Sequence, residues 1–205
     1  MKEFDLWDLE NEIVKKAYQG ENYQVWNRPV EGKKCLILFS GNGLFYPNTE
    51  NSFKECIFEK DRYEYQSLAK SKNLQCFSRI IFVRDIYKQW YVNGMNATCP
   101  DVEKTAAVLR EKTEGYQITT AGNSAGGYAA VLFGILLSAK RIYSFSGQFD
   151  ITDKKGNKFI DLYEQDETRN CFYDLRPLLR KMDVDTKYIT FVRMRMRVIE
   201  FSMNW

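Results

Sequence analysis

The sequence predicts an α/β fold in which a mostly parallel sheet is covered by helices on both faces. Short apolar stretches typical of buried strands alternate along the chain with longer stretches typical of helices. Such alternation favours parallel strands joined by crossover helices. No repeat, linker or low-complexity segment divides the chain, so we expect residues 1–205 to form a single domain. Its 205 residues, 44% of them hydrophobic, are enough to bury one core.

Each strand is predicted from a short run of β-branched, aromatic or aliphatic residues. The predicted strands are Lys34–Phe39, Phe77–Val83, Tyr116–Ala121, Arg141–Phe145 and Tyr188–Val192. The predicted helices are Asp5–Tyr18, Asp101–Glu114, Ala129–Leu137 and a short one over Asp174–Lys181. Helix-breaking residues support these boundaries, since Gly20 follows the first helix and Pro100 and Gly115 flank the second.

The remaining segments indicate less regular structure. Residues 1–30 are expected to form a helical lead-in, and the mixed polar and aromatic stretch Phe53–Leu68 one or two short helices. The polar, glycine-bearing stretch 147–170 is expected to cross the strand ends as a lid. The tail 192–205 begins by alternating apolar residues with arginines, a pattern typical of an edge strand. A patch that binds phosphate or nucleic acid is the less favoured interpretation of those arginines.

The most informative motif is the run Gly122–Gly127, which holds Gly-Asn-Ser-Ala-Gly between a predicted strand and a predicted helix. A strand–turn–helix of this kind presents a serine nucleophile on a sharp turn. Gly122 and Gly126 remove the Cβ atoms that would collide as the turn closes. Ser124 is therefore the predicted nucleophile. The N–H of Ala125, at the positive start of the helix, is predicted to donate one hydrogen bond to an oxyanion.

Two other interpretations of this motif exist. Glycine-rich turns before helices also bind phosphate groups. That interpretation is disfavoured because no Gly-Lys-Ser/Thr follows and the spacing does not match the dinucleotide fingerprint. A chance Gly-x-Ser-x-Gly in an ordinary loop is the second alternative, and the predicted strand and helix around the motif argue against it. No cofactor is expected.

Composition narrows the function classes. A net charge of +3 is too small to indicate a nucleic-acid-binding protein. The five cysteines are scattered, without the close pairs of a zinc site or a disulfide framework, and so indicate reduced thiols and no metal centre. The first residues lack a signal-peptide pattern and no apolar run could span a bilayer, so we expect a cytoplasmic protein. The chain contains no histidine.

The order of these features resembles the α/β-hydrolase superfamily. The resemblance rests on the loop Gly41–Gly43 after a strand and on the motif Gly122–Gly126, and it covers about residues 33–191. More narrowly, the strings Gly122–Tyr128 and Ser144–Gln148 resemble hydrolase-like proteins of bacterial capsule and surface-polysaccharide loci. The superfamily implies a three-layer sandwich. It also implies acyl transfer, either by ester hydrolysis or by passage of an acyl group to a sugar hydroxyl.

The resemblance also implies roles for single residues. The loop Ser40–Gly43 stands where the superfamily has its oxyanion loop, which makes the Asn42 amide the second donor candidate; Asn-Gly is equally typical of a simple tight turn. Asp150 follows the fourth predicted strand and is the candidate triad acid, with a solvated loop residue as the favoured alternative. Asp183 and Asp185 precede the last predicted strand and would lie at the wrong end of the sheet.

The superfamily places a histidine base near the C-terminus, and this chain has none. After Tyr188–Phe191 the expected acid loop, final strand, helix and histidine loop are missing, and the tail does not resemble the superfamily. A frameshift or an early stop would explain this difference, and the sheet is expected to lack its last strand and helix. Without a general base, a serine enzyme loses about 10²–10⁴-fold in rate.

Two functions from different classes follow. One is a serine-dependent acyl hydrolase, esterase or O-acyltransferase that acts on a carbohydrate or small ester in surface-polysaccharide biosynthesis, with impaired activity. The other is a non-catalytic α/β-hydrolase-like protein that binds a glycan or a partner. Arg84 and Trp90 follow a strand and could contact an anionic substrate and a sugar ring, but packing is the favoured interpretation. An open sheet edge would favour a homodimer.

Overall fold

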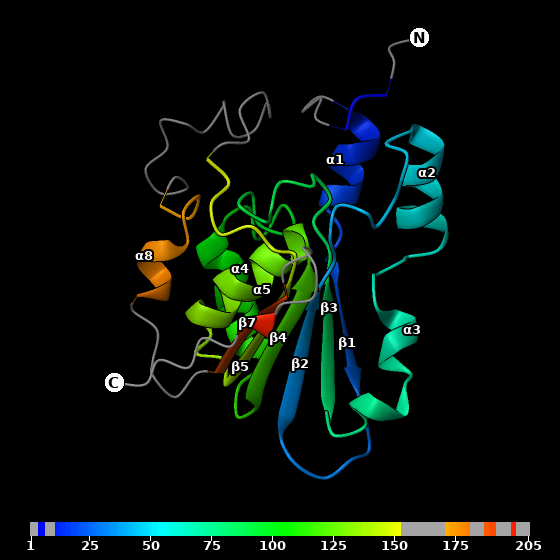
Figure 1. Ribbon diagram of the computed structural model, residues 1–205. Helices are drawn as coiled ribbons and strands as arrows, with labels where there is room; N and C mark the ends of the chain where they lie inside the picture. Colours follow the sequence, from blue (N-terminus) through cyan, green and yellow to red (C-terminus); the bar gives the residue numbers. More distant parts are fainter. Residues whose placement is uncertain (1–3, 7–10, 153–170, 181–186, 192–197, 200–205) are drawn as a thin grey trace.

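Seven strands form one sheet in the computed structural model of the chain (Figure 1). They are β1 (Tyr23–Asn27), β2 (Lys34–Phe39), β3 (Arg79–Val83), β4 (Gln117–Asn123), β5 (Arg141–Phe145), β6 (Lys187–Phe191) and β7 (Val198–Ile199). Their order across the sheet is β1-β3-β2-β4-β5-β6-β7. The five central strands are parallel, whereas β1 and β7 each run antiparallel to their neighbour. The structure describes residues 4–6, 11–152, 171–180, 187–191 and 198–199.

Helices lie on both sides of the sheet, with α2 and α3 on one side and α4, α5 and α8 on the other (Figure 1). The helices are α1 (Glu12–Tyr18), α2 (Glu50–Lys54), the π-helical turn η1 (Glu55–Glu59), α3 (Gln66–Ala69), the 3-10 turn η2 (Lys72–Leu74), α4 (Val102–Lys112), α5 (Ala125–Leu136) and α8 (Arg176–Leu179). The predicted fold class, a mostly parallel sheet with helices on both faces, is thus confirmed.

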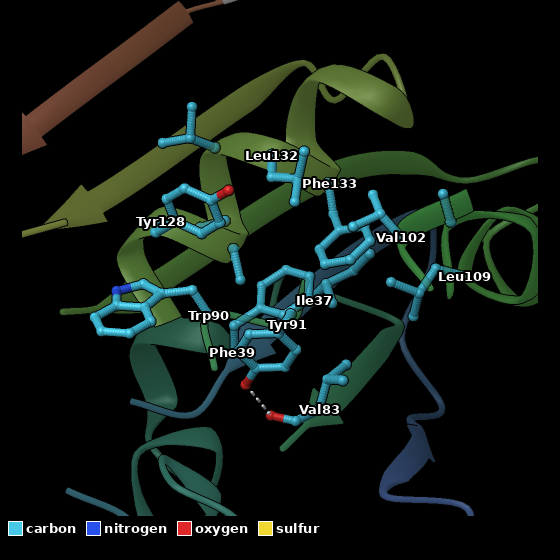
Figure 2. Close-up of a cluster of buried hydrophobic side chains, with 14 of the residues drawn as sticks. Ile37, Phe39, Val83, Trp90, Tyr91, Val102, Leu109, Tyr128, Leu132 and Phe133 are labelled. Carbon is cyan, nitrogen blue, oxygen red and sulfur yellow. Dashed lines mark hydrogen bonds between the residues drawn. The ribbon is translucent and has the colours of Figure 1, made fainter. Parts of the chain in front are cut away.

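The two faces of the sheet follow from the alternation of side chains along β2 and β3. One set packs with α4 and α5: Cys35, Ile37, Phe39, Ile81 and Val83. The other set packs with the segment around α3: Leu36, Leu38, Ile80 and Phe82. Figure 2 shows the first cluster, in which the Phe39 and Phe133 rings stack with their centroids 5.3 Å apart. Both faces are therefore buried, as in parallel sheets generally.

Local chemistry explains where the surface helices begin. Helix α4 starts after Asp101, whose carboxylate accepts a hydrogen bond from the Lys104 N–H at 2.7 Å. Asn11 caps α1 in the same way, with its Oδ1 accepting from the N–H groups of Ile13 and Val14. The basic residues in the last turn of α4 complement the negative end of the helix dipole.

Several elements differ from the sequence prediction, among them α1, which begins at Glu12 and not at Asp5. The expected helical lead-in, residues 1–30, also contains the strand β1, which was missed because its side chains are half-buried without a clear alternation. Helix α5 begins at Ala125, four residues before the predicted start, because Gly126 and Gly127 belong to the helix and not to a turn. Strand β4 correspondingly extends to Asn123. The serine of the motif is thus the single residue between a strand and a helix.

Several expectations concern residues outside the described part of the chain. These are residues 153–170 of the expected lid and residues 192–197 and 200–205 of the tail. Within the tail, Val198–Ile199 forms β7 and pairs antiparallel with β6. In the part of the chain that the structure describes, no helix combines the length and the apolar character needed to cross a membrane.

Candidate active site

Ser124 adopts an unusual backbone conformation between β4 and α5. Its φ is +54° and its ψ is −120°, a region that residues with a Cβ rarely occupy. Hydrogen bonds hold the turn, since the Ser124 N–H donates to the Phe145 carbonyl at 2.8 Å and the Ser124 carbonyl accepts from the Tyr128 N–H at 3.0 Å. Strain of this kind persists only where the surrounding structure enforces it. This is the conformation that a nucleophile elbow requires.

Two glycines allow the turn to close. A Cβ on Gly122 would lie 2.2 Å from the Gly126 carbonyl oxygen, and a Cβ on Gly126 would lie 2.1 Å from the Phe39 carbonyl oxygen. No real Cβ approaches an oxygen so closely. The first turn of α5 therefore packs directly against the ends of β2 and β4, and the pattern of the motif has a steric cause.

Ala125 is the first residue of α5 and is fully buried. The Ser124 side chain makes no capping hydrogen bond, and no other described side chain accepts one from the first N–H groups of the helix. The positive end of the helix dipole adds to the field at this point. An anion beside Ser124 would therefore meet uncapped donors at the helix start.

The loop after β2 lies against the elbow. A Cβ on Gly41 would be 2.7 Å from the carbonyl oxygen of Asn123, the residue that precedes the serine. The loop also contains a tight turn, in which the Leu44 N–H donates to the Gly41 carbonyl at 3.2 Å. Neither Asn42 nor Gly43 adopts the positive φ that Asn-Gly favours, so this is not the hairpin-type turn considered from the sequence. The structure thus brings the predicted oxyanion loop next to the predicted nucleophile.

Asp150 is engaged by neighbouring protein groups. Its Oδ1 accepts hydrogen bonds from the N–H and the hydroxyl of Thr152, and its Oδ2 forms an ion pair with Arg176 at 2.8 Å. The Thr152 hydrogen bonds, with a further contribution from Arg176, lower the pKa of the Asp150 carboxyl. Asp150 also forms a β-bridge with Asp174. Its contacts join the chain after β5 to the segment before α8.

Arg84 and Trp90 are both buried and bonded to protein groups. The Arg84 guanidinium binds Asn22 Oδ1, the Arg62 carbonyl and Asp61, and it lies over the Tyr63 ring at 4.4 Å. The Trp90 indole N–H donates to Gln148 Oε1 at 2.9 Å. These contacts match the packing interpretation of both residues.

The sequence analysis missed Asp85, a buried carboxylate at the end of β3. Its oxygens accept hydrogen bonds from the N–H groups of Tyr87, Gln89 and Tyr91 at 3.0, 2.5 and 3.0 Å. Burial raises the pKa of this carboxyl to about 6, and the backbone N–H groups oppose the shift. Asp85 follows Arg84 directly in the sequence, but it belongs to no motif that would have predicted its role.

Lys88 is a second buried ionisable residue of this segment. Its ammonium donates to the Phe45 carbonyl at 2.6 Å and to Asn48 Oδ1 at 2.7 Å, and it lies 3.7 Å from the centre of the Phe45 ring. Burial lowers its pKa to about 8. Lys88 thereby connects the 85–91 segment by hydrogen bonds to the loop that follows β2.

Glu64 and Tyr65 also reach the candidate site. Glu64 Oε2 accepts a hydrogen bond from the Gly41 N–H at 2.6 Å, and the Glu64 N–H donates to Ser40 Oγ at 3.2 Å. The Tyr65 hydroxyl is buried, and burial raises its pKa while the nearby Asn123 backbone N–H opposes the shift. Neither residue carried a sequence signal, because both come from the irregular segment before α3. No group of metal-ligating side chains is found among the described residues.

The chain was compared with known proteins. Protein-family models give no match, and curated proteins give none. Among solved structures, the capsule O-acetyltransferase of Neisseria meningitidis serogroup A in complex with caged gadolinium has a TM-score of 0.53 and 17% identity, covering 83% of this chain and 69% of that chain. Another structure with the same protein name has a TM-score of 0.50 and 18% identity, covering 83% and 70%.

A third similar structure is the glycosylation associate protein (Gap123) complex of Streptococcus agalactiae. It has a TM-score of 0.53 and 16% identity, and the match covers 82% of this chain but only 33% of that chain. Identities this low establish a shared fold and not a shared activity. The capsule O-acetyltransferase has an α/β-hydrolase-like fold. This chain therefore has an α/β-hydrolase-like fold.

Proposed function

We propose that the chain is a serine-dependent acyl hydrolase, esterase or O-acyltransferase of low activity, acting on a carbohydrate or a small ester. The observation that carries the proposal is the conformation of Ser124, a non-glycine residue held at φ +54° before an uncapped helix. Glycine would fit this position without strain, so a side chain at this position has a cost. A reactive serine hydroxyl is a functional reason for a strained side chain at this position.

The proposed reaction proceeds in two steps. Ser124 Oγ adds to the acyl carbonyl, and the N–H groups of Ala125 and Asn42 stabilise the resulting oxyanion. The leaving group departs, and the acyl-serine ester then passes its acyl group to water or to a sugar hydroxyl. The chain has no histidine to accept the serine proton, so in this proposal the proton passes to solvent. Loss of a positioned general base lowers the rate by about 10²–10⁴-fold.

The substrate class is inferred from the structural neighbours. The meningococcal protein is named a capsule O-acetyltransferase, and a histidine-to-alanine mutant of it is described in complex with CoA. We infer acetyl transfer from a thioester donor to a polysaccharide hydroxyl as the first reaction to test. Surface-polysaccharide biosynthesis and a cytoplasmic location are parts of the same proposal, and the homodimer stays a prediction that size-exclusion chromatography checks.

A fluorophosphonate probe tests the proposal directly, because such probes phosphonylate activated serines. We expect one adduct per chain on Ser124, located by peptide mass spectrometry, and slow turnover of p-nitrophenyl acetate. Ser124→Ala is the matched control, since it keeps the Cβ and removes only the hydroxyl. Folded wild-type protein that takes no label, or label that persists in Ser124→Ala, would contradict the proposal.

A non-catalytic glycan-binding protein is the second candidate function. The observation in its favour is the absence of histidine from all 205 residues. It predicts that capsule oligosaccharides bind equally well to wild-type protein and to Ser124→Ala, in calorimetry, while the probe labels neither. Neither proposed function uses Arg84 or Trp90, because both side chains are buried against other protein groups.

A further inference from the structure

The segment 85–91 is wrapped around one carboxylate. The Asp85 oxygens accept hydrogen bonds from three backbone N–H groups of that segment. Three of its residues, Lys88, Trp90 and Tyr91, have positive φ values of 54°, 54° and 62°. Each such conformation costs roughly 1–3 kcal/mol in a non-glycine residue. Lys88 and Trp90 lie between the N–H donors, and Tyr91 is itself a donor, so we conclude that this carboxylate holds the turn in shape.

This turn contacts the candidate oxyanion loop at several points. The Tyr91 hydroxyl donates to the Ser40 carbonyl at 2.8 Å and also lies 3.1 Å from the Val83 carbonyl, as Figure 2 shows for the second contact. The Lys88 carbonyl accepts from Asn42 Nδ2 at 3.4 Å, and the Lys88 ammonium donates to the Phe45 carbonyl. The loop is thus bonded to the 85–91 turn before, at and after Asn42.

The N–H groups of the loop are not equivalent. The Gly41 N–H donates a hydrogen bond to Glu64 Oε2 at 2.6 Å, and the Leu44 N–H donates one to the Gly41 carbonyl. Within the described ranges, no group accepts a hydrogen bond from the Asn42 N–H. Asn42 therefore has a backbone donor available beside the elbow, and its neighbour Gly41 does not.

We propose that Asp85 is a positioning residue of this site, which acts through Lys88 and Tyr91 to hold the Asn42 N–H in place for the oxyanion. The inference rests on the proposed function for its catalytic part. Preorganised donors stabilise the transition state more than the ground state. Loss of Asp85 should accordingly lower the maximal rate of reaction at Ser124 and change the concentration dependence little.

The experiment compares wild-type protein with Asp85→Asn, which has the same shape but replaces one acceptor oxygen by a donor. Asp101→Asn is the matched control, because asparagine caps a helix as well as aspartate and the Asp101 carboxylate contacts Lys104, not residues 40–48. Two readouts are taken from each protein. One is hydrogen exchange of peptides covering residues 40–48, and the other is the fluorophosphonate labelling rate of Ser124 as a function of probe concentration.

The expected result is faster exchange in residues 40–48 of Asp85→Asn alone. The maximal labelling rate should fall by up to about 10²–10³-fold, the effect of removing one oxyanion donor, with the half-saturating probe concentration within about twofold of wild type. Unchanged exchange in residues 40–48 overturns the proposal whatever the labelling shows. Faster exchange with an unchanged maximal rate also overturns it. If wild-type protein takes no label, the proposed function fails, and faster exchange still supports Asp85 as the residue that positions the loop.

Tyr91→Phe gives a second test should Asp85→Asn fail to fold. This variant keeps the buried ring between Phe39 and Phe133 and removes only the hydroxyl that binds the Ser40 carbonyl. We expect the same pattern with a smaller amplitude, faster exchange at residues 40–48 and a lower maximal labelling rate. Wild-type exchange in folded Tyr91→Phe would overturn the proposed link between the turn and the loop.

Discussion

The turn at Ser124 is held by backbone packed against backbone, whereas the loop beside it, residues 40–43, is held by side chains from distant segments. At the turn, Gly122 and Gly126 approach carbonyl oxygens so closely that no Cβ fits. At the loop, the Gly41 N–H binds Glu64 and the Ser40 carbonyl binds Tyr91. The turn is therefore intolerant of an added Cβ at both glycines. The loop has one such close contact, at Gly41 against the Asn123 carbonyl, and otherwise depends on a few polar contacts.

Because of this difference, substitutions in the two parts of the site should affect different properties of the protein. A change at Gly122 or Gly126 should act on folding, because their close contacts join the sheet to its central helix. A change at the loop should act on rate, because it moves a donor without removing buried apolar surface. Of the four predictions below, the first two test that separation and the others test side chains around the site, from the largest expected effect to the smallest.

Gly126→Ala should destabilise the protein by about 3 kcal/mol or more, because its Cβ would lie 2.1 Å from the Phe39 carbonyl oxygen. Urea unfolding followed by circular dichroism measures the change. Gly43→Ala is the matched control in the loop, where an added Cβ meets nothing within 4 Å. Equal stability of the two variants would contradict the proposed difference between turn and loop.

Ser124→Gly should raise the free energy of unfolding by about 1 kcal/mol, because glycine relieves the strain at φ +54° and loses part of that gain to chain entropy. Ser124→Ala keeps the strain and should differ little from wild type. Both variants should lose labelling by the fluorophosphonate probe. A Ser124→Gly protein less stable than Ser124→Ala would show that the turn is not strained.

Lys88→Met should change how stability depends on pH. Burial lowers the pKa of Lys88 from its usual 10.5 to about 8 in the folded protein. Between these values the unfolded chain binds more protons, so the contribution of Lys88 to stability rises as the pH increases from about 8 to about 10.5. Urea midpoints at pH 8, 9 and 10 should therefore rise less in Lys88→Met than in wild type. Parallel curves would contradict a lowered pKa of Lys88 in the folded protein.

Asp150→Asn should have the smallest effect. The exposed ion pair with Arg176 contributes at most about 1 kcal/mol, and the labelling rate of Ser124 should not change. Asp174→Asn is the control, since Asp174 binds the same arginine. A tenfold slower labelling in Asp150→Asn alone would support the triad-acid role expected from the superfamily.

The sequence predicted the turn well because its signal is local. Glycines around a serine, a strand before it and an apolar helix after it all lie within 117–136, and short-range sterics explain each of them. The parallel strands were equally predictable, since both of their faces are buried and their residues form apolar runs. The predicted start of α5 was wrong because Gly126 and Gly127 are typical of turns, although close packing requires them inside a helix.

The loop side of the site could not be predicted in the same way. Asp85 binds backbone N–H groups of a turn in which Lys88, Trp90 and Tyr91 have positive φ. Positive φ is usually predicted from glycine, and these three positions are not glycine. Glu64 is 23 residues from the Gly41 N–H that it binds. Strand β1 was missed for a related reason, because an edge strand needs only one partner and its side chains carry no strong pattern.

Helix α5 is buried on every side from Ala125 to Gly134, which limits where a proton acceptor for Ser124 could be introduced. No position on those turns can take a histidine without overfilling the core. The serine itself is only half-buried, so its open side faces the surface. A base must therefore approach from outside the helix, and added imidazole is the simplest one. The acceleration of Ser124 labelling by imidazole would measure how well the nucleophile and the oxyanion donors are already positioned.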